Sequence, residues 1–189
     1  MLTIENLRDI DLQSMYKTYD KWPSIAKESY EKPLDKIDLK NVEHVVFAGM
    51  GGSGAIGDVF SSILSKMEIH VTVVKGYLLP KTVNENTVVI CTSISGNTDE
   101  TLSVLKNSEK LNAKFVGLSS GGLMKDYCEK NITDYYKIEK EHSPRASFIG
   151  FLYSTLNILE PILPISKNEI EESIISLDHT KNLIDSNNL

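Results

Sequence analysis

The stretch Val-Glu-His-Val-Val-Phe-Ala-Gly-Met-Gly-Gly-Ser-Gly at residues 42–54 joins a run of β-branched and aromatic residues to a loop of small ones. The run is typical of a buried parallel strand. The loop places Gly49, Gly51, Gly52 and Gly54 where a helix is expected to begin, and glycine lets the backbone approach a ligand closely. The free N–H groups and the positive dipole end of a helix start favour an anion. The stretch therefore predicts a strand, an anion-binding loop and a helix in succession.

The same order of strand, loop and helix recurs along the chain. Strands are expected at 42–48, 69–74, 87–92, 114–118 and 133–138. Helices are expected at about 53–65, 98–110, 121–130 and 145–160. Strands that alternate with helices call for a parallel sheet covered on both faces, so the fold class is predicted to be α/β.

The two ends of the chain lie outside this alternating region. Apolar residues recur at helical spacing before Pro23, at Leu12, Met15, Tyr16, Tyr19 and Trp22. Beyond Pro164 a second amphipathic pattern predicts one more helix, followed by a fraying end at 186–189. We therefore divide the chain into a helical segment at 1–40 that packs on the domain, the domain itself at 41–165, and a helix with a tail at 166–189.

Composition excludes several classes of function. Hydrophobic residues make up 41% of the 189 residues, which is enough for the core of one α/β domain. The net charge of −6 argues against a nucleic-acid partner, and no apolar run reaches the roughly 18 residues of a membrane helix. Residues 1–6 do not resemble an export signal, so we expect a cytoplasmic protein. Cys91 and Cys128 are too few for a disulfide framework or a metal-ligand set and are expected to be free, buried thiols.

The first glycine loop has alternative interpretations. Gly49-x-Gly51-x-x-Gly54 has the spacing of a dinucleotide fingerprint, but that site also needs an acidic residue after the second strand, where the chain has Lys75. A P-loop would need lysine and serine or threonine after the glycines, and a nucleophile elbow would need glycine in place of Ala55. A dinucleotide site therefore stays a weaker alternative to a simple anion site.

The second loop presents three hydroxyls, on Ser93, Ser95 and Thr98, at the end of another strand. A phosphate monoester has three terminal oxygens and suits a cup of short hydrogen-bond donors. A structural role is also expected, because Asn97 can cap the following helix with Glu100 three residues on. The two roles are compatible.

Ser143-Pro144-Arg145 is a third motif, in which serine can be an N-cap and proline the first helical residue. Arg145 then falls in the first turn, where a cation opposes the helix dipole by a few tenths of a kcal/mol. Its position predicts either full solvation or an anionic neighbour. His44 and His70, by contrast, begin strands at the amino end and are expected to be structural.

Four motifs then combine into one pattern. They are Gly-Met-Gly-Gly-Ser-Gly-x-x-Gly-Asp at 49–58, Ser-Ile-Ser-Gly-Asn-Thr-x-Glu-Thr-Leu at 93–102, Ser-Ser-Gly-Gly at 119–122 and Pro-Arg-Ala at 144–146. Their order and spacing resemble the N-terminal domain of the bifunctional phosphoglucose/phosphomannose isomerases, in the sugar isomerase (SIS) domain superfamily. The resemblance implies a three-layer αβα sandwich with a five-stranded parallel sheet, wound in the doubly wound, flavodoxin-like manner, and a reaction that needs neither metal nor cofactor.

The resemblance also implies a small-molecule sugar phosphate as ligand. The residues expected to hold its phosphate or to border its sugar are Gly52, Ser53, Ser93, Ser95 and Thr98. Arg145 would be catalytic, since a guanidinium near C1 and C2 stabilises the charge of a cis-enediolate during aldose–ketose isomerisation. A homodimer is expected from the habit of SIS domains and from the broadly apolar helix at 145–160.

No residue of this chain corresponds to the general base of the family. In the family, the glutamate that moves the proton and the histidine and lysine that assist ring opening belong to a second SIS domain, to which residues 166–189 would lead. His179 and Lys181 match no family motif. The chain is therefore expected to have one of two functions. It is part of an isomerase that converts glucose 6-phosphate and mannose 6-phosphate into fructose 6-phosphate, or it is a non-catalytic SIS module with a phosphosugar-binding or regulatory role.

Overall fold

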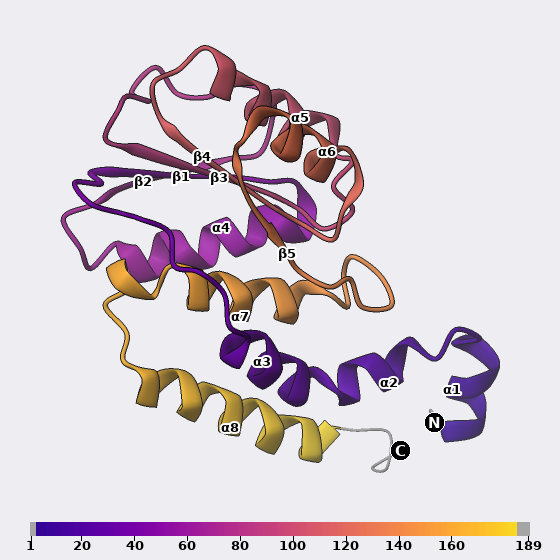
Figure 1. Cartoon of the computed structure of the whole chain (residues 1–189). Coiled ribbons are helices and arrows are strands. Elements are labelled where there is room, and N and C mark those ends of the chain that lie inside the picture. Colours follow the sequence, from indigo (N-terminus) through magenta and orange to yellow (C-terminus); the bar gives the residue numbers. More distant parts are fainter. Residues whose placement is uncertain (1–2, 185–189) are drawn as a thin grey trace.

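Five parallel strands form the centre of the computed structural model, which describes residues 3–184 (Figure 1). They are β1 (His44–Ala48), β2 (His70–Val74), β3 (Thr87–Ser93), β4 (Lys114–Ser119) and β5 (Asp134–Lys137), in the order β2-β1-β3-β4-β5. Every neighbouring pair is parallel. The predicted five-stranded, doubly wound sheet is confirmed. The fraying end predicted at 186–189 lies outside the described residues.

Helices cover both faces of this sheet (Figure 1). On one face lie α4 (Gly51–Leu64) and α7 (Phe148–Ile158), whose apolar side chains join one core cluster with Phe47 and Ile90. On the other face lie α5 (Asp99–Leu105) and α6 (Gly122–Asn131), which pack in a second cluster with Val89 and Phe115. The predicted three-layer αβα sandwich is confirmed as well.

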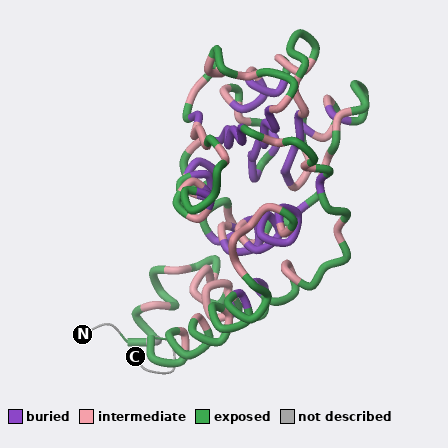
Figure 2. Tube along the Cα trace, turned by 90° about the vertical axis from the view of Figure 1, so that its left-hand side faces the viewer, coloured by how far each residue is buried: buried purple, intermediate pink, exposed green. Residues whose placement is uncertain are grey.

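The terminal helices add a further layer beneath α7 (Figure 1). They are α1 (Ile4–Ile10), α2 (Met15–Asp20), α3 (Trp22–Glu31) and α8 (Lys167–Ile184). α3 packs against both α7 and α8. Figure 2 shows that most buried residues lie in the sheet and in the helices packed on it, whereas the terminal helices are largely exposed.

The expected apolar pattern before Pro23 is only partly correct. Leu12 lies between α1 and α2 and is 85% exposed, so it does not pack on the domain. Pro23 does not end a helix but lies in the first turn of α3, where the missing N–H costs nothing. The pattern therefore spans two helices instead of one.

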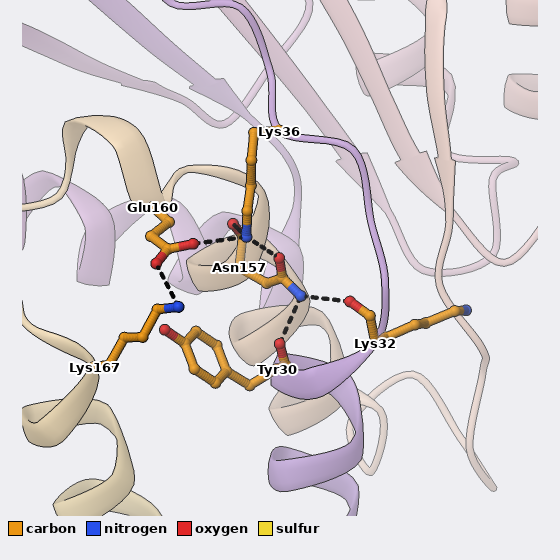
Figure 3. A network of polar contacts seen from close by, with 6 residues as sticks. All are labelled: Tyr30, Lys32, Lys36, Asn157, Glu160 and Lys167. Atoms are coloured by element: carbon orange, nitrogen blue, oxygen red, sulfur yellow. Dashed lines mark hydrogen bonds and ion pairs between the residues drawn. The ribbon is translucent and has the colours of Figure 1, made fainter.

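A polar network anchors α3 to the end of α7 (Figure 3). The side-chain amide of Asn157, which is 3% exposed, donates to the carbonyl oxygens of Tyr30 and Lys32 at 2.6 and 2.8 Å. The ammonium of Lys36 donates to the backbone carbonyl of Asn157 at 2.7 Å and pairs with Glu160 at 2.8 Å. The pKa of Glu160 is lowered, chiefly because Lys36 donates a hydrogen bond to it. These contacts fix the path of the chain between α3 and β1.

The strand order determines where a ligand can bind. From β1 the chain moves to β2 on one side and then crosses to β3 on the other, so the winding reverses between β1 and β3. In doubly wound sheets this switch point opens a crevice at the carboxyl ends of the strands. The first glycine loop follows β1 and the second loop follows β3, so both loops border that crevice.

Candidate functional site

The first loop turns directly from β1 into α4. Met50 is the extended N-cap residue, and α4 begins at Gly51, two residues before the predicted start. Gly51 has a φ of +53°, a left-handed conformation that glycine adopts without the strain of a side chain. The N–H groups of the first turn have no partner within the helix and are available to a ligand. Ser53 lies in this turn and is 9% exposed.

The second loop is held against the loop that follows β4. Gly96 has a φ of +72°, and a Cβ built on it would lie 1.8 Å from the carbonyl oxygen of Gly121. The hydroxyl of Ser95 accepts a hydrogen bond from the N–H of Asn97 at 3.2 Å and is itself exposed. Because Gly96 has no side chain, the two loops can touch at this point.

The predicted capping of α5 by Asn97 is wrong. The N-cap of α5 is Thr98, and its side chain makes no capping bond. Asn97 instead uses its side-chain oxygen to accept the N–H of Leu123 at 2.9 Å, in the first turn of α6. The asparagine therefore caps the next helix along the sheet, which its spacing in the sequence could not indicate.

Arg145 lies in a turn before α7 and not in the first turn of the helix. The N-cap of α7 is Ser147. Ser143 accepts the N–H of Ala146 with its hydroxyl at 3.3 Å, and its carbonyl accepts the N–H of Ser147 at 3.0 Å. The predicted capping role of Ser143 thus applies to this turn. Arg145 is exposed on it.

These three segments enclose a cavity of about 450 Å³. Its lining residues are Trp22, Met50, Gly52, Ser53, Ile94, Ser95, Thr98, Pro144, Arg145 and Phe148. Five of the six residues predicted for the site are among them. Ser93 is not, because it is 1% exposed and its hydroxyl contacts Thr98 at 2.8 Å.

The lining separates into a polar and an apolar part. Hydroxyls and helix-start N–H groups come from the two loops, whereas Trp22, Met50, Ile94 and Phe148 supply apolar surface. Arg145 gives the lining its charged group. Such a cavity suits a ligand with an anionic end and a less polar body.

The acidic residues at the start of α5 stay out of this lining. Asp99 and Glu100 stand in the first turn of α5, where negative charge complements the helix dipole. Glu100 faces Tyr77, and its charge raises the pKa of that phenol. Lys75, after β2, is paired with Asp58 at 2.6 Å. The anion-binding potential of the cavity is therefore not cancelled by carboxylates on its wall.

Sequence reasoning missed half of the cavity lining. Trp22 was assigned to packing, and Met50, Ile94, Pro144 and Phe148 were not singled out as site residues. An apolar side chain that lines a cavity looks the same in the sequence as one that packs in the core. Trp22 also lies 123 positions before Arg145, so the sequence does not place the two together. Position inside the quoted motifs is the signal that could have found Met50, Ile94 and Pro144.

Other possible functional groups lie elsewhere. Cys91 and Cys128 are free and buried, as predicted, and burial raises the pKa of both thiols, that of Cys128 to about 11. His44 and His70 lie at the amino ends of β1 and β2, away from the cavity. Within residues 3–184 no group of three or more His, Cys, Asp or Glu side chains is arranged to hold a metal ion. No helix in that range combines the length and apolar character needed to cross a membrane.

The chain folds into a doubly wound α/β domain with a cavity at its switch point. Residues 38–151 match the SIS domain model, and the chain belongs to the SIS domain family. The chain is 32% identical over 170 residues to a bifunctional phosphoglucose/phosphomannose isomerase from Caldicellulosiruptor bescii, a match that covers 85% of this chain and 49% of that protein. The chain therefore spans about half the length of this curated relative.

Solved structures share the fold at low sequence identity. The C-terminal domain of glucosamine-fructose-6-phosphate aminotransferase from Francisella tularensis superposes with a TM-score of 0.61 and 16% identity, over 89% of this chain and 53% of that one. The sugar isomerase domain of an RpiR transcription factor from Sphaerobacter thermophilus gives a TM-score of 0.53 and 15% identity, over 93% and 96% of the two chains. One architecture thus occurs in enzymes and in a regulator.

Proposed function

We propose that the chain is the phosphosugar-binding part of an isomerase that interconverts glucose 6-phosphate or mannose 6-phosphate with fructose 6-phosphate. The observation that carries the proposal is the convergence of Ser53, Ser95, Thr98 and Arg145 on one cavity at the switch point. The name of the Caldicellulosiruptor bescii relative supports the choice of reaction. The size of the cavity, about 450 Å³, is within the range of small-molecule sites.

Different parts of the cavity would bind different parts of the ligand. The hydroxyls of Ser95 and Thr98 would donate to the phosphate oxygens, and Gly52 and Ser53 would border the sugar with the open N–H groups of α4. The guanidinium of Arg145 would lie near C1 and C2 and stabilise the cis-enediolate. Charge that develops on the sugar thus explains why a cation stands in this wall.

Proton transfer between C1 and C2 needs a base, which the lining does not provide. The lining residues include no Asp, Glu, His or Lys side chain. A base must come within hydrogen-bond reach of the carbon acid for the reaction to proceed. The other half of the relatives' length would supply it, so residues 3–184 would bind the substrate and stabilise the intermediate without completing the reaction.

The proposal also covers the oligomeric state, the cellular compartment and the division of the chain into segments. We infer a homodimer in the cytoplasm, with 1–40, 41–165 and 166–189 as helical segment, SIS domain and connection to a second SIS domain. A second candidate function is a non-catalytic module that senses a phosphosugar. The RpiR domain favours it, because the present chain covers 96% of that regulator's domain.

Calorimetry combined with a turnover assay tests the proposal. The chain is titrated with glucose 6-phosphate, with glucose and with inorganic phosphate, and is assayed for formation of fructose 6-phosphate. We expect binding of glucose 6-phosphate, weaker binding of phosphate and no turnover. Failure to bind glucose 6-phosphate contradicts the proposal, and turnover by the chain alone contradicts the assignment of the base to another domain.

A further inference from the structure

Trp22 connects the N-terminal helices to the arginine turn, residues 143–147. Its indole N–H donates to the carbonyl oxygen of Ala146 at 2.9 Å, across 124 positions of sequence. Ala146 directly follows Arg145. The same indole lines the cavity together with the loops that carry the hydroxyls. One side chain thus forms part of the cavity wall and holds the backbone beside the guanidinium.

Local hydrogen bonds determine the shape of the arginine turn. The hydroxyl of Ser147 donates to the carbonyl of Ser143 at 2.7 Å and accepts the N–H of Glu141 at 2.9 Å. The N–H of Ala146 donates to the hydroxyl of Ser143 at 3.3 Å. All of these bonds join residues within the segment 141–147. The turn also joins α7, where the N–H groups of Phe148 and Phe151 donate to the carbonyls of Arg145 and Ser147 at 3.3 and 3.2 Å, and the Trp22 bond adds an attachment to α3.

The N-terminal helices provide further contacts of that kind. The hydroxyl of Ser143 donates to the sulfur of Met15 at 3.6 Å. The carboxylate of Asp11, in turn, accepts the N–H of Tyr16, the residue after Met15, at 2.9 Å. Together with the Trp22 bond, the Met15 contact attaches the turn to the N-terminal helices at Ser143 and at Ala146.

The indole itself is held in place. Trp22 is half-buried against the larger core cluster, and Tyr19 meets its ring edge to face with centroids 4.8 Å apart. Pro23 and Ile25, which follow it in α3, are buried. Trp22 lies outside residues 38–151, which match the SIS model, whereas Arg145 lies inside them. The support of the arginine turn thus comes from a segment outside the residues that match the SIS model.

We propose that Trp22 is a positioning residue for Arg145: its N–H fixes the turn 143–147 at the cavity, so the guanidinium is preorganised for the sugar. The inference rests on the proposed function, because it assigns the wall that Trp22 supports to the sugar end of the ligand. Trp22 is the one tryptophan among the 189 residues, so its fluorescence reports on this wall alone.

The proposal is tested with three forms of the full chain. Trp22→Phe removes the indole, and replacement of Trp22 by benzothienylalanine removes the N–H while keeping the bicyclic shape. Phe115→Leu is the control for lost packing, since Phe115 is 5% exposed in the cluster on the other face of the sheet. Each form is titrated with glucose 6-phosphate and with inorganic phosphate, and amide hydrogen exchange is followed at Ala146 and Ser147.

We expect both Trp22 forms to bind glucose 6-phosphate about threefold to tenfold more weakly, the equivalent of one hydrogen bond, with phosphate affinity unchanged. Exchange at Ala146 and Ser147 should become faster in both, and the control should match the native chain. Unchanged exchange with benzothienylalanine, or equal losses for the two ligands, overturns the proposal. A native chain that binds neither ligand refutes the proposed function, while the exchange result still decides whether Trp22 fixes the turn.

Discussion

The hydroxyl of Ser93 lies 2.8 Å from the hydroxyl of Thr98. Ser93 is 1% exposed and also accepts the N–H of Gly96 at 3.1 Å, so its bonds are made within the loop. Thr98, in contrast, lines the cavity. We infer that Ser93 contributes to phosphate binding by orienting Thr98 and by shaping the loop, and not through direct contact.

Substitutions at these two residues are therefore expected to differ. Thr98→Val removes a hydroxyl that we propose binds the phosphate and should weaken glucose 6-phosphate binding by about 1–2 kcal/mol. Ser93→Ala removes the hydroxyl bonds to Thr98 and to the N–H of Gly96, which keeps the Ser93 carbonyl as acceptor at 2.9 Å, so the free energy of unfolding should fall by about 0.5–1.5 kcal/mol, with a smaller effect on binding. Calorimetry and urea unfolding measure the two effects. A larger binding loss for Ser93→Ala would contradict the indirect role.

Gly96→Ala tests the contact between the second loop and the loop after β4. The new methyl would meet the carbonyl of Gly121, and the φ of +72° is strained for alanine. We expect the free energy of unfolding to fall by more than about 2 kcal/mol. Gly76→Ala is the matched control, because nothing lies within 4 Å of a Cβ at that position, and it should change stability by less than about 1 kcal/mol. Similar losses in the two variants would refute the close approach.

Asn157→Leu tests the network that anchors α3 to α7. Leucine fills a similar volume but leaves the carbonyls of Tyr30 and Lys32 without the amide donor. We expect a loss of about 2–4 kcal/mol in the free energy of unfolding, measured with urea. Asn131→Ala removes an exposed amide that donates to the carbonyl of Tyr127, and it should cost less than about 1 kcal/mol. A native-like Asn157→Leu chain would show that the network is dispensable.

His44 should make stability depend on pH. Burial, followed by the charge of His70, lowers its pKa below the usual value of about 6.5. The unfolded chain then takes up a proton at higher pH than the folded chain, so the free energy of unfolding falls as pH decreases from about 6.5 through the folded-state pKa. His44→Gln should flatten this slope between about pH 7.5 and 5.5. His179→Gln, on the exposed side of α8, should leave it intact, and a slope unaffected by His44→Gln would contradict the assignment.

The sequence predicted the sheet because its central strands, β1, β3 and β4, are short runs of mostly buried residues between loops and helices. Residues 44–48 and 87–93 are buried throughout, and such runs are typical of a parallel sheet. The loops after these strands could be located for the same reason. Both loops lie at one switch point because of the order of the strands. The resemblance to the SIS family implied that order.

Contacts between distant segments could not be predicted in this way. Asn97 caps α6 and not α5, because the loops after β3 and β4 lie side by side in the fold. Trp22 reaches Ala146 across 124 positions, and an aromatic residue at helical spacing is ordinarily a packing residue. Local periodicity describes an element and its buried face, whereas the partner of a polar group depends on the whole fold.

Titration of the chain with glucose 6-phosphate, before and after Ser95→Ala, tests the central claim most directly. Ser95 is exposed in the cavity, and loss of a charge-assisted bond to phosphate should weaken binding by about 1.5–3 kcal/mol. Ser103→Ala, on α5 and outside the cavity lining, is the matched control and should bind as the native chain does. We expect inorganic phosphate to show the same loss in Ser95→Ala. Equal affinity of the native and Ser95→Ala chains for glucose 6-phosphate would contradict the phosphate site.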